Sequence, residues 1–326
     1  FSLPALPPGR KPLPPGRRRS HNATKGLVIP LLLEMKHITK VYGSLYANDD
    51  VHLSLNQGEI LAVVGENGAG KSTLMKILYG LERPTAGEIY LNGELQHFRS
   101  PHDAIAKKIG MVQQHFMLLG PCSVAENIVY GREPRKHGIF FDREAAVRIT
   151  ESLCEKYGLH IDPRLRVADC PVGLQQRVEI LKVLYQDADI IIFDEPSAVL
   201  TPQEVTELLA TMRKLAEMGK SIIIITHKLN EVMDISDRVA ILRKGEYITT
   251  VNTAETNEQA LTEWMVGRKI DLNIERPAVE KTRPLLEIRD LTIKNDEGAV
   301  AIDKVSFYIR GGEILGVAGI AGCGQK

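Results

Sequence analysis

The stretch that decides the fold is residues 60–73, ILAVVGENGAGKST. Its first five residues, Ile60–Val64, are all apolar, which predicts a buried strand of a parallel sheet. Residues Leu74–Tyr79 have the apolar spacing of a helix and are followed by Gly80. A strand, a glycine-rich loop and a helix in this order form the setting of a phosphate-binding loop. The loop comprises Gly65, Glu66, Asn67, Gly68, Ala69, Gly70, Lys71, Ser72 and Thr73.

The residue types of this loop suit a phosphate ligand. Glycines let backbone N–H groups approach phosphate oxygens, and the N-terminus of the following helix adds the positive end of its dipole. We expect Lys71 to reach the β- and γ-phosphates of a nucleotide and the Ser72 hydroxyl to bind Mg²⁺. The sequence therefore predicts a site for a nucleoside triphosphate and Mg²⁺.

Two further apolar runs predict strands that lead into charged side chains. Ile190–Phe193 is followed by Asp194 and Glu195, and Ser221–Ile225 is followed after one residue by His227. Parallel strands place their carboxyl ends at one edge of the sheet, where ligands bind. We expect Asp194 to hold the metal, Glu195 to polarise the attacking water and His227 to orient that water at the γ-phosphate. Without the preceding loop, these residues would be ordinary caps or surface groups.

A helix is predicted between these two strands. Thr201–Glu204 has the pattern of a capping box, with Pro202 at the first helical position. Apolar residues then recur at a spacing of three to four up to Ala216, and Gly219 ends the pattern. Strand, helix and strand in this order predict a crossover connection in a parallel sheet. Residues Arg238–Leu242 predict one more strand.

Charge is unevenly distributed along the chain. Its 326 residues carry 41 Lys and Arg against 41 Asp and Glu. Residues 1–33 hold six basic residues, no acidic residue and seven of the 17 prolines, so residues 34–326 have a net charge of −6. The balance argues against nucleic acid held by bulk electrostatics. We expect residues 1–33 to form a disordered leader, because such a composition cannot bury a core. A targeting peptide or a basic arm for anionic lipid is the alternative.

Composition also excludes other classes of protein. No stretch approaches the roughly 20 apolar residues of a membrane span. The cysteines, Cys122, Cys154, Cys170 and Cys323, are far apart and form no C-x-x-C pair, which argues against disulfide and zinc frameworks and favours a cytosolic chain.

Taken together, these motifs resemble those of the ATP-binding-cassette (ABC) ATPases. The run from Pro171 to Lys182 lies between the phosphate-binding loop and Asp194 and is similar to the family's signature motif, usually L-S-G-G-Q followed by a helix. By itself this run would predict only an amphipathic helix. The family presents this motif to the γ-phosphate of a nucleotide held by another cassette. The residues that match it are Pro171, Val172, Gly173, Leu174 and Gln175.

The resemblance implies further site residues and a fold. Gln114 matches the family's Q-loop glutamine, which senses Mg²⁺ and couples to the membrane subunits, with Gln113 as the competing choice. Tyr42 matches the aromatic residue that stacks on adenine, with Tyr46 as its rival. The implied fold is an α/β P-loop NTPase cassette with a mixed sheet, an antiparallel β part and an α-helical subdomain. We expect that subdomain within residues 100–168, facing a permease.

An internal repeat indicates a second cassette. Gly58–Gly65 is echoed at Gly312–Gly319, 254 residues later, and Leu286–Thr292 is similar to Leu33–Thr39. In the second loop Gln325 replaces the lysine, and loss of a comparable electrostatic contact costs on the order of 2–4 kcal/mol. We predict a leader at 1–33, a first cassette at 34–269, a linker at 270–284 and the truncated start of a second cassette at 285–326. The chain would then be a fragment.

The resemblance extends over about residues 35–326 and is most specific to ATPase subunits of bacterial importers for nucleosides and simple sugars. It implies an ATP- and Mg²⁺-dependent ATPase on the cytoplasmic face of the bacterial membrane. Its expected partners are permease subunits, an extracytoplasmic substrate-binding protein indirectly, and a second cassette or another copy, but no nucleic acid. The motifs favour nucleosides. The alternatives are sugar import, such as ribose or galactose, and a soluble tandem cassette acting on ribosomes or DNA.

The signature departs from the family pattern. Pro171 stands where a serine usually donates its hydroxyl, and Leu174 stands where Gln or Glu is usual. In head-to-tail pairs, the altered loop around Gln325 would face this altered signature. We therefore expect both weaknesses to fall in one composite site, and turnover by this chain to be slow unless it pairs with another copy.

Overall fold

The computed structural model describes residues 31–269, 283–294 and 298–319. The chain divides into two compact units, residues 1–270 and 271–326. Most of the predicted leader and linker, and Gly322, Gly324 and Gln325 of the second loop, lie outside the described residues.

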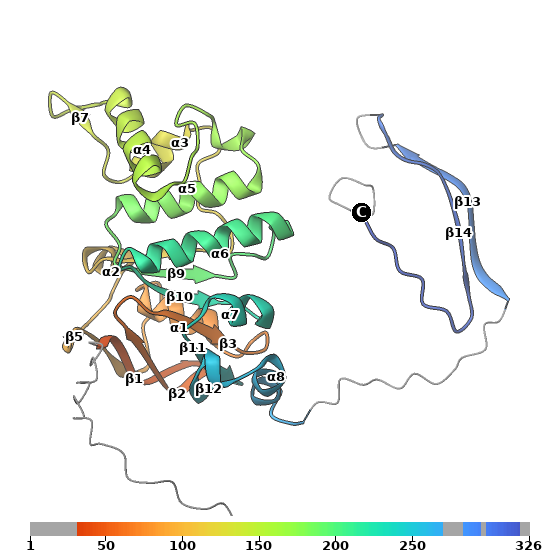
Figure 1. The fold of residues 1–326 in the computed structure, drawn as a ribbon, viewed down its shortest axis with the longest axis horizontal. Coiled ribbons are helices and arrows are strands. Elements are labelled where there is room, and N and C mark those ends of the chain that lie inside the picture. Colours follow the sequence, from red (N-terminus) through yellow and green to blue (C-terminus); the bar gives the residue numbers. More distant parts are fainter. Residues whose placement is uncertain (1–30, 270–282, 295–297, 320–326) are drawn as a thin grey trace, which may run out of the picture. The chain divides into compact units, whose positions relative to one another are not determined.

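A ten-stranded mixed sheet forms the centre of the first unit (Figure 1). Its spatial order is β5 (Glu94–Gln96), β4 (Ala86–Leu91), β1 (Leu31–Tyr42), β2 (Leu45–Asn56), β12 (Glu246–Asn252), β11 (Arg238–Arg243), β3 (Ile60–Val64), β10 (Ser221–Ile225), β9 (Ile190–Asp194) and β6 (Ile109–Val112). Strands β11, β3, β10, β9 and β6 pair in parallel, whereas β5, β4, β1 and β2 pair antiparallel. The predicted mixed sheet with an antiparallel part is confirmed.

The helices cover this sheet in chain order. They are α1 (Lys71–Leu78), α2 (Pro101–Ala106), α3 (Val124–Val129), α4 (Arg143–Tyr157), α5 (Val172–Tyr185), α6 (Pro202–Glu217), α7 (Leu229–Ile235) and α8 (Glu258–Val266). Short 3₁₀ turns span Val167–Asp169 and Thr253–Glu255. A small hairpin of β7 (Arg135–Lys136) and β8 (Phe140–Phe141) precedes α4. No helix among the described residues is long and apolar enough to cross a bilayer.

The predicted α-helical subdomain is present, but its limits differ from residues 100–168. Helices α3, α4 and α5 lie together with the β7–β8 hairpin at one end of the first unit (Figure 1). Strand β6, within the predicted range, instead pairs with β9 in the central sheet, with Ile109 opposite Ile190. Its four residues are all buried, and a short apolar run does not by itself distinguish a strand from a helix segment.

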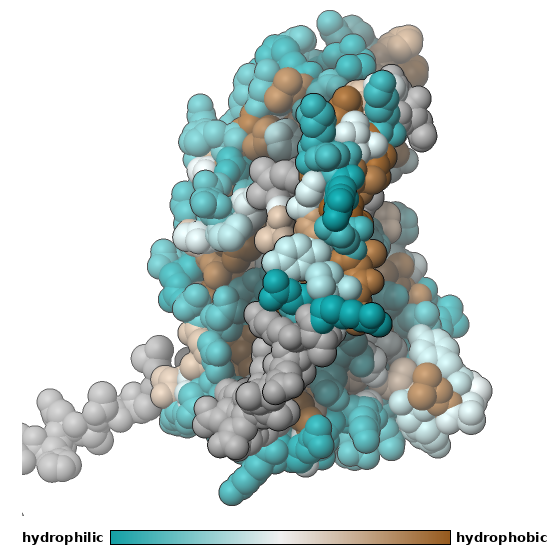
Figure 2. All heavy atoms as spheres, turned by 90° about the vertical axis from the view of Figure 1, so that its right-hand side faces the viewer, coloured by the Kyte–Doolittle hydropathy of each residue, from teal (hydrophilic) through white to brown (hydrophobic). Residues whose placement is uncertain are grey.

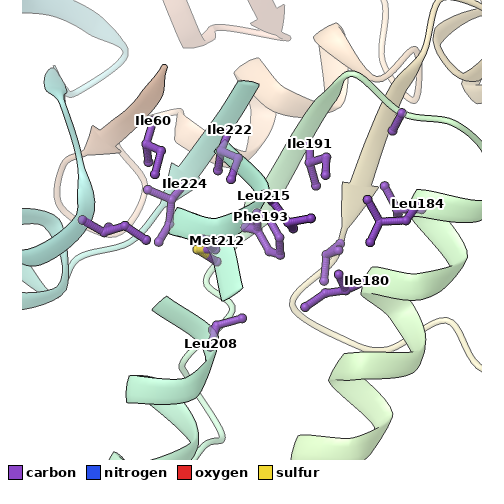
Figure 3. Close-up of a cluster of buried hydrophobic side chains, with 14 of the residues drawn as sticks. Ile60, Ile180, Leu184, Ile191, Phe193, Leu208, Met212, Leu215, Ile222 and Ile224 are labelled. Atoms are coloured by element: carbon purple, nitrogen blue, oxygen red, sulfur yellow. The ribbon is translucent and has the colours of Figure 1, made fainter. Parts of the chain in front are cut away.

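The central strands are buried on both faces because apolar side chains point to each side in turn. One cluster contains Ile60, Ala62, Phe193 and Ile224, packed against α5 and α6. Figure 3 shows Leu208, Met212 and Leu215 of α6 directed at these strands, with Ile180 and Leu184 of α5 beside them. The alternate residues Leu61, Val63, Ile192 and Ile225 belong to a second cluster with α1, β1 and β2. The strands that end at the site therefore have little freedom to shift.

Two strand boundaries differ slightly from the predicted domain limits. Strand β1 begins at Leu31, inside the predicted leader, because Leu33 is fully buried and pairs with Leu55 on one side and Leu91 on the other. In the second unit, β13 (Pro284–Lys294) begins at the last residue of the predicted linker and pairs antiparallel with β14 (Val300–Arg310). Hydrophilic side chains predominate on the face of the molecule in Figure 2, with hydrophobic ones scattered among them.

Candidate functional site

The loop between β3 and α1 has a backbone that requires glycine at two positions. A Cβ at Gly65 would lie 2.3 Å from the Leu242 carbonyl oxygen of β11. Gly70 has φ +94, and a Cβ there would lie 2.1 Å from the Ala47 carbonyl oxygen. Gly70 is the N-cap of α1, which no side chain caps, so the first N–H groups of the helix are free to face a ligand.

Two neighbours that sequence reasoning missed hold the loop in place. Asn48 of β2 is fully buried and its Nδ2 donates to the Gly70 carbonyl at 3.1 Å. Its Oδ1 is buried without a partner among the described residues. On the other side, the Gly245 N–H donates to the Ala69 carbonyl at 3.2 Å. An isolated Asn in a strand carries no recognisable sequence signal, so only the fold reveals its role.

Lys71 lies inside the loop. The residue is 5% exposed, and its ammonium donates to the carbonyl oxygens of Gly65 and Glu66 at 2.8 and 2.9 Å. Burial lowers the pKa of Lys71, and the nearby Glu195 and Asp194 carboxylates partly oppose this effect. The cation is thus held at the centre of the loop in a poorly hydrated setting, where its attraction for a phosphate is strengthened.

Asp194 and Ser72 form a pair of oxygen ligands. The Ser72 hydroxyl donates to Asp194 Oδ1 at 3.2 Å, and the aspartate is buried. Burial raises the pKa of Asp194, although the Ser72 hydrogen bond acts in the opposite direction. Adjacent ligands of octahedral Mg²⁺ lie about 3.0 Å apart, given Mg–O distances of 2.0–2.1 Å. The spacing and the hard oxygen chemistry of these two residues fit this ion.

Glu195 and His227 meet at the same edge of the sheet. His227 Nδ1 lies 3.3 Å from Glu195 Oε1. Glu195 has φ +46, an uncommon left-handed conformation for this residue, and its N–H donates to the Ile225 carbonyl of β10 at 2.9 Å. Backbone strain of this kind concentrates at functional sites and is held in place by the surrounding structure. Lys71, Ser72, Asp194, Glu195 and His227, predicted from separate motifs, are therefore connected at one edge of the sheet.

The signature residues occupy the start of α5. The helix begins at Val172, and Pro171 is an N-cap without a side-chain hydrogen bond. Hydrogen bonds from the Thr201 backbone and hydroxyl, and a further one from the Gly173 backbone, lower the pKa of Glu204 in α6. This contact joins the capping box of α6 to the start of α5. The role of these residues towards another cassette stays a prediction.

A further link joins the signature helix to the acidic pair. Gln176, buried in α5, donates from Nε2 to the Pro196 carbonyl at 2.8 Å, two residues beyond Asp194. In the same loop, the Ser197 hydroxyl donates to the buried Glu231 carboxylate of α7 at 2.7 Å. Sequence reasoning missed Gln176 and Glu231, because a polar residue on a helix is normally an exposed one.

The tyrosine and glutamine assignments stay predictions. Tyr42 and Tyr46 flank the β1–β2 turn and are 45% and 53% exposed, so both could offer a ring to a base. Lys40 Nζ lies 4.9 Å from the centre of the Tyr42 ring. Gln114 is exposed and Gln113 half-buried after β6. These contacts do not decide between the two members of either pair.

Comparison with known proteins agrees with this architecture. Residues 48–198 match the family model described as ABC transporter. The chain is 49% identical over 294 residues to the nucleoside import ATP-binding protein NupA of Lactococcus lactis and 47% identical over 295 residues to the guanosine import ATP-binding protein NupO of Bacillus subtilis. Each match covers 90% of this chain but 58% of the relative, so the chain spans little more than half the length of these proteins.

A solved structure shows the same fold. The cbiO1 protein of Clostridium perfringens, part of the cbiONQ ABC transporter complex, is 25% identical, with a TM-score of 0.61 over 75% of this chain and 96% of that one. The family match, the relatives and the fold agree with the loop, the acidic pair and the histidine described above. The chain therefore belongs to the ABC transporter family and contains its ATP-binding cassette.

Proposed function

We propose that the chain is the ATP-binding and ATP-hydrolysing part of a subunit that powers nucleoside import through a separate permease. The observation that carries the proposal is the convergence of Lys71, Ser72, Asp194, Glu195 and His227 at one sheet edge. The names of the two relatives, which refer to nucleoside and guanosine import, support the substrate class.

The residues act on ATP in distinct ways. The backbone N–H groups of the loop and the Lys71 ammonium bind the phosphate chain. Ser72 and Asp194 would hold Mg²⁺, which neutralises charge on the β- and γ-phosphates. Glu195 accepts a hydrogen bond from the attacking water, whose oxygen bonds to the γ-phosphorus as the bond to the β–γ bridging oxygen breaks. His227, beside Glu195, orients that water and contacts the γ-phosphate.

Nucleotide binding is tested with a fluorescent ATP analogue titrated into the purified chain. Wild-type protein should show saturable, Mg²⁺-dependent binding. Lys71→Ala should weaken binding by about two orders of magnitude, because loss of such a contact costs on the order of 2–4 kcal/mol. Lys76→Ala, which removes a cation further along α1, is the matched control and should bind like wild type. Equal binding by Lys71→Ala and wild type would refute the proposed site.

The permease is proposed to dock on the α-helical subdomain. The connection between α3 and α4 exposes Tyr130 by 58%, Ile139 by 78% and Phe140 by 69%. Exposed apolar residues that cluster in this way mark interaction sites on soluble domains. With the permease in the membrane, this contact would hold the subunit at the cytoplasmic face of the bacterial cell. Co-purification with a permease rather than with ribosomes tests this assignment.

Nucleosides and sugars are separated by transport. Cells that carry the parent gene and its permease should take up radiolabelled nucleoside, and excess unlabelled nucleoside should suppress this uptake. Excess ribose should leave it unchanged. If ribose competes and nucleoside does not, the sugar alternative is correct.

The composite-site arrangement follows from the signature. In a full-length protein, the loop around Gln325 is proposed to face the altered signature around Pro171, which leaves the site of Lys71 as the competent one. Lys71→Ala should then abolish turnover, and substitution of Gln325 should not. The reverse result would show that the assignment of the two sites is wrong.

A further inference from the structure

Two histidines and an aspartate come together on the exposed side of β1 and β2, outside the proposed nucleotide site. His37 Nδ1 lies 2.7 Å from Asp50 Oδ1, and His52 Nε2 lies 3.7 Å from the same oxygen. The two imidazole rings are edge to face, with centroids 4.3 Å apart. One ligand atom from each residue lies within 4.8 Å of the other two.

Two bulges produce this cluster. Between the pairs Met35↔Leu53 and Ile38↔Val51, strand β1 has one residue more than β2, and His37 takes φ +54 there. Beyond Ile38↔Val51, β2 has the extra residue, and Asp50 takes φ +50. Bulges redirect side chains locally. The two extra residues flank a buried pair and leave their side chains on the outer face beside His52.

The second unit repeats both bulges with different side chains. In β13 and β14 the pairs Ile288↔Phe307 and Leu291↔Val305 enclose one extra residue, Asp290, with φ +45. The second bulge has Lys304 at φ +48. The amide of Asp50 bonds to the Thr39 hydroxyl at 3.2 Å, and that of Lys304 bonds to Thr292 at 3.1 Å.

The backbone of the bulges is thus common to both hairpins, whereas the ligand set is not. Asp290, Lys304 and Ser306 stand where the first hairpin has His37, Asp50 and His52. The second hairpin has one carboxylate, one cation and one hydroxyl at these positions, which cannot form a comparable metal site. Geometry alone therefore does not explain two imidazoles and a carboxylate in the first hairpin.

We propose that His37, Asp50 and His52 form a Zn²⁺ site. Imidazole nitrogen and carboxylate oxygen are zinc ligands, and a tetrahedral ion with bonds of 2.0–2.1 Å spaces its ligands by about 3.3 Å. The observed separations of 2.7 and 3.7 Å lie on either side of that value. Mg²⁺ prefers oxygen ligands, so the nitrogen donors distinguish this site from Ser72 and Asp194. The exposed position leaves the fourth ligand place to water.

The lysine next to the cluster in sequence is engaged elsewhere. The ammonium of Lys36, adjacent to His37, pairs with Glu34 at 3.2 Å and lies 4.8 Å from the centre of the Tyr90 ring. The Asp50 carboxylate therefore faces the two imidazoles rather than this cation, which leaves it available as a metal ligand.

The test is calorimetric titration of ZnCl₂ into the tag-free chain without nucleotide. Wild type should bind one ion at this site. The control uses substitutions taken from the second hairpin, His37→Asp, Asp50→Lys and His52→Ser, since those residues occupy the same bulged backbone there. Each single change should weaken binding by about tenfold or more, and the triple variant should lose the site.

A second measurement identifies the ligands. Electron paramagnetic resonance of bound Cu²⁺ should show coupling to two imidazole nitrogens in wild type and to one in His37→Asp or His52→Ser. Melting temperature and nucleotide binding should be unchanged in the triple variant, which shows that the fold is intact. Unsaturable binding by wild type, or equal Zn²⁺ binding by wild type and the triple variant, would overturn the proposal and leave a surface ion pair. In the second case the cysteines, which all variants retain, would be the source.

Discussion

At the scale of single residues, burial opposes the charges of both Lys71 and Asp194. It lowers the pKa of the lysine and raises that of the aspartate, so each charged form is disfavoured in the ligand-free chain. A phosphate beside Lys71 or a metal beside Asp194 reverses this effect. The site is thus built at a cost to stability that its ligands would offset.

The first prediction concerns Asp194→Asn. Because the folded pKa of Asp194 is raised, the native state binds this proton more strongly than the unfolded chain, and stability falls as pH rises from the unfolded pKa through the folded one. In the absence of nucleotide, Asp194→Asn should therefore melt at a higher temperature than wild type at pH 7. The difference should shrink towards pH 4.

Thermal melts between pH 4 and 8 measure this effect, with Glu195→Gln as the control on the neighbouring carboxylate. The amide oxygen that Asp194→Asn introduces can still accept the Ser72 hydroxyl, so the hydrogen bond is not the variable. A lower melting temperature at pH 7, or a difference that grows in acid, would contradict the assignment of burial as the dominant cause.

The second prediction separates binding from chemistry. Glu195→Gln keeps the size of the side chain but removes the base beside His227. Binding of ATP should be unchanged, and single-turnover hydrolysis should fall by about 10²- to 10⁴-fold. Rapid-quench assays at saturating ATP measure the second quantity. Hydrolysis at the wild-type rate would show that Glu195 is not the base.

At the scale of elements, the N-terminus of α6 offers a clean test of capping. The Thr201 hydroxyl accepts from the Glu204 N–H, and the Glu204 carboxylate accepts from the Thr201 N–H. Thr201→Ala should reduce the free energy of unfolding by about 1 kcal/mol. Thr201→Ser keeps the hydroxyl and should be close to wild type. Urea unfolding of all three proteins measures the effect, and equal loss in both variants would show that the methyl group matters instead.

The close contact of the loop with β11 leads to a fourth prediction. A Cβ at Gly65 would meet the Leu242 carbonyl at 2.3 Å, and neither backbone can yield easily. Gly65→Ala should therefore cost about 1–3 kcal/mol and weaken nucleotide binding. At Gly120 a Cβ would make an ordinary contact of 3.6 Å with Ala168, so Gly120→Ala is the matched control. Calorimetric melts and nucleotide titration check both variants, and equal behaviour would contradict the steric argument.

The elements that carry the site could be predicted because their signals are local. Five consecutive apolar residues predicted β3, a capping box predicted the start of α6, and the acidic pair marked the end of β9. The left-handed backbone of Glu195 could not be predicted, because it depends on a carbonyl of β10 thirty residues away. The same is true of Asn48, whose contact with Gly70 exists only once β2 lies beside the loop.

At the scale of the whole molecule, turnover should depend on association of chains. The signature residues at the start of α5 are proposed to serve another cassette, so one copy would lack part of its own site. The hydrolysis rate per chain should rise with protein concentration, as an ATPase assay across a dilution series would show. Glu195→Gln with Mg²⁺ and ATP should form dimers by light scattering. A rate that is independent of concentration in a monomeric protein would refute this prediction.

The backbone bond between Glu195 and Ile225 has a mechanical consequence. It fastens the end of β9 to the end of β10, and His227 follows Ile225 by only two residues. The carboxylate and the imidazole are thus anchored to one point and would travel as a single rigid body if the loops around them rearranged. Their separation would then be the invariant of the cycle, and approach of the nucleotide to this pair would be the quantity that changes.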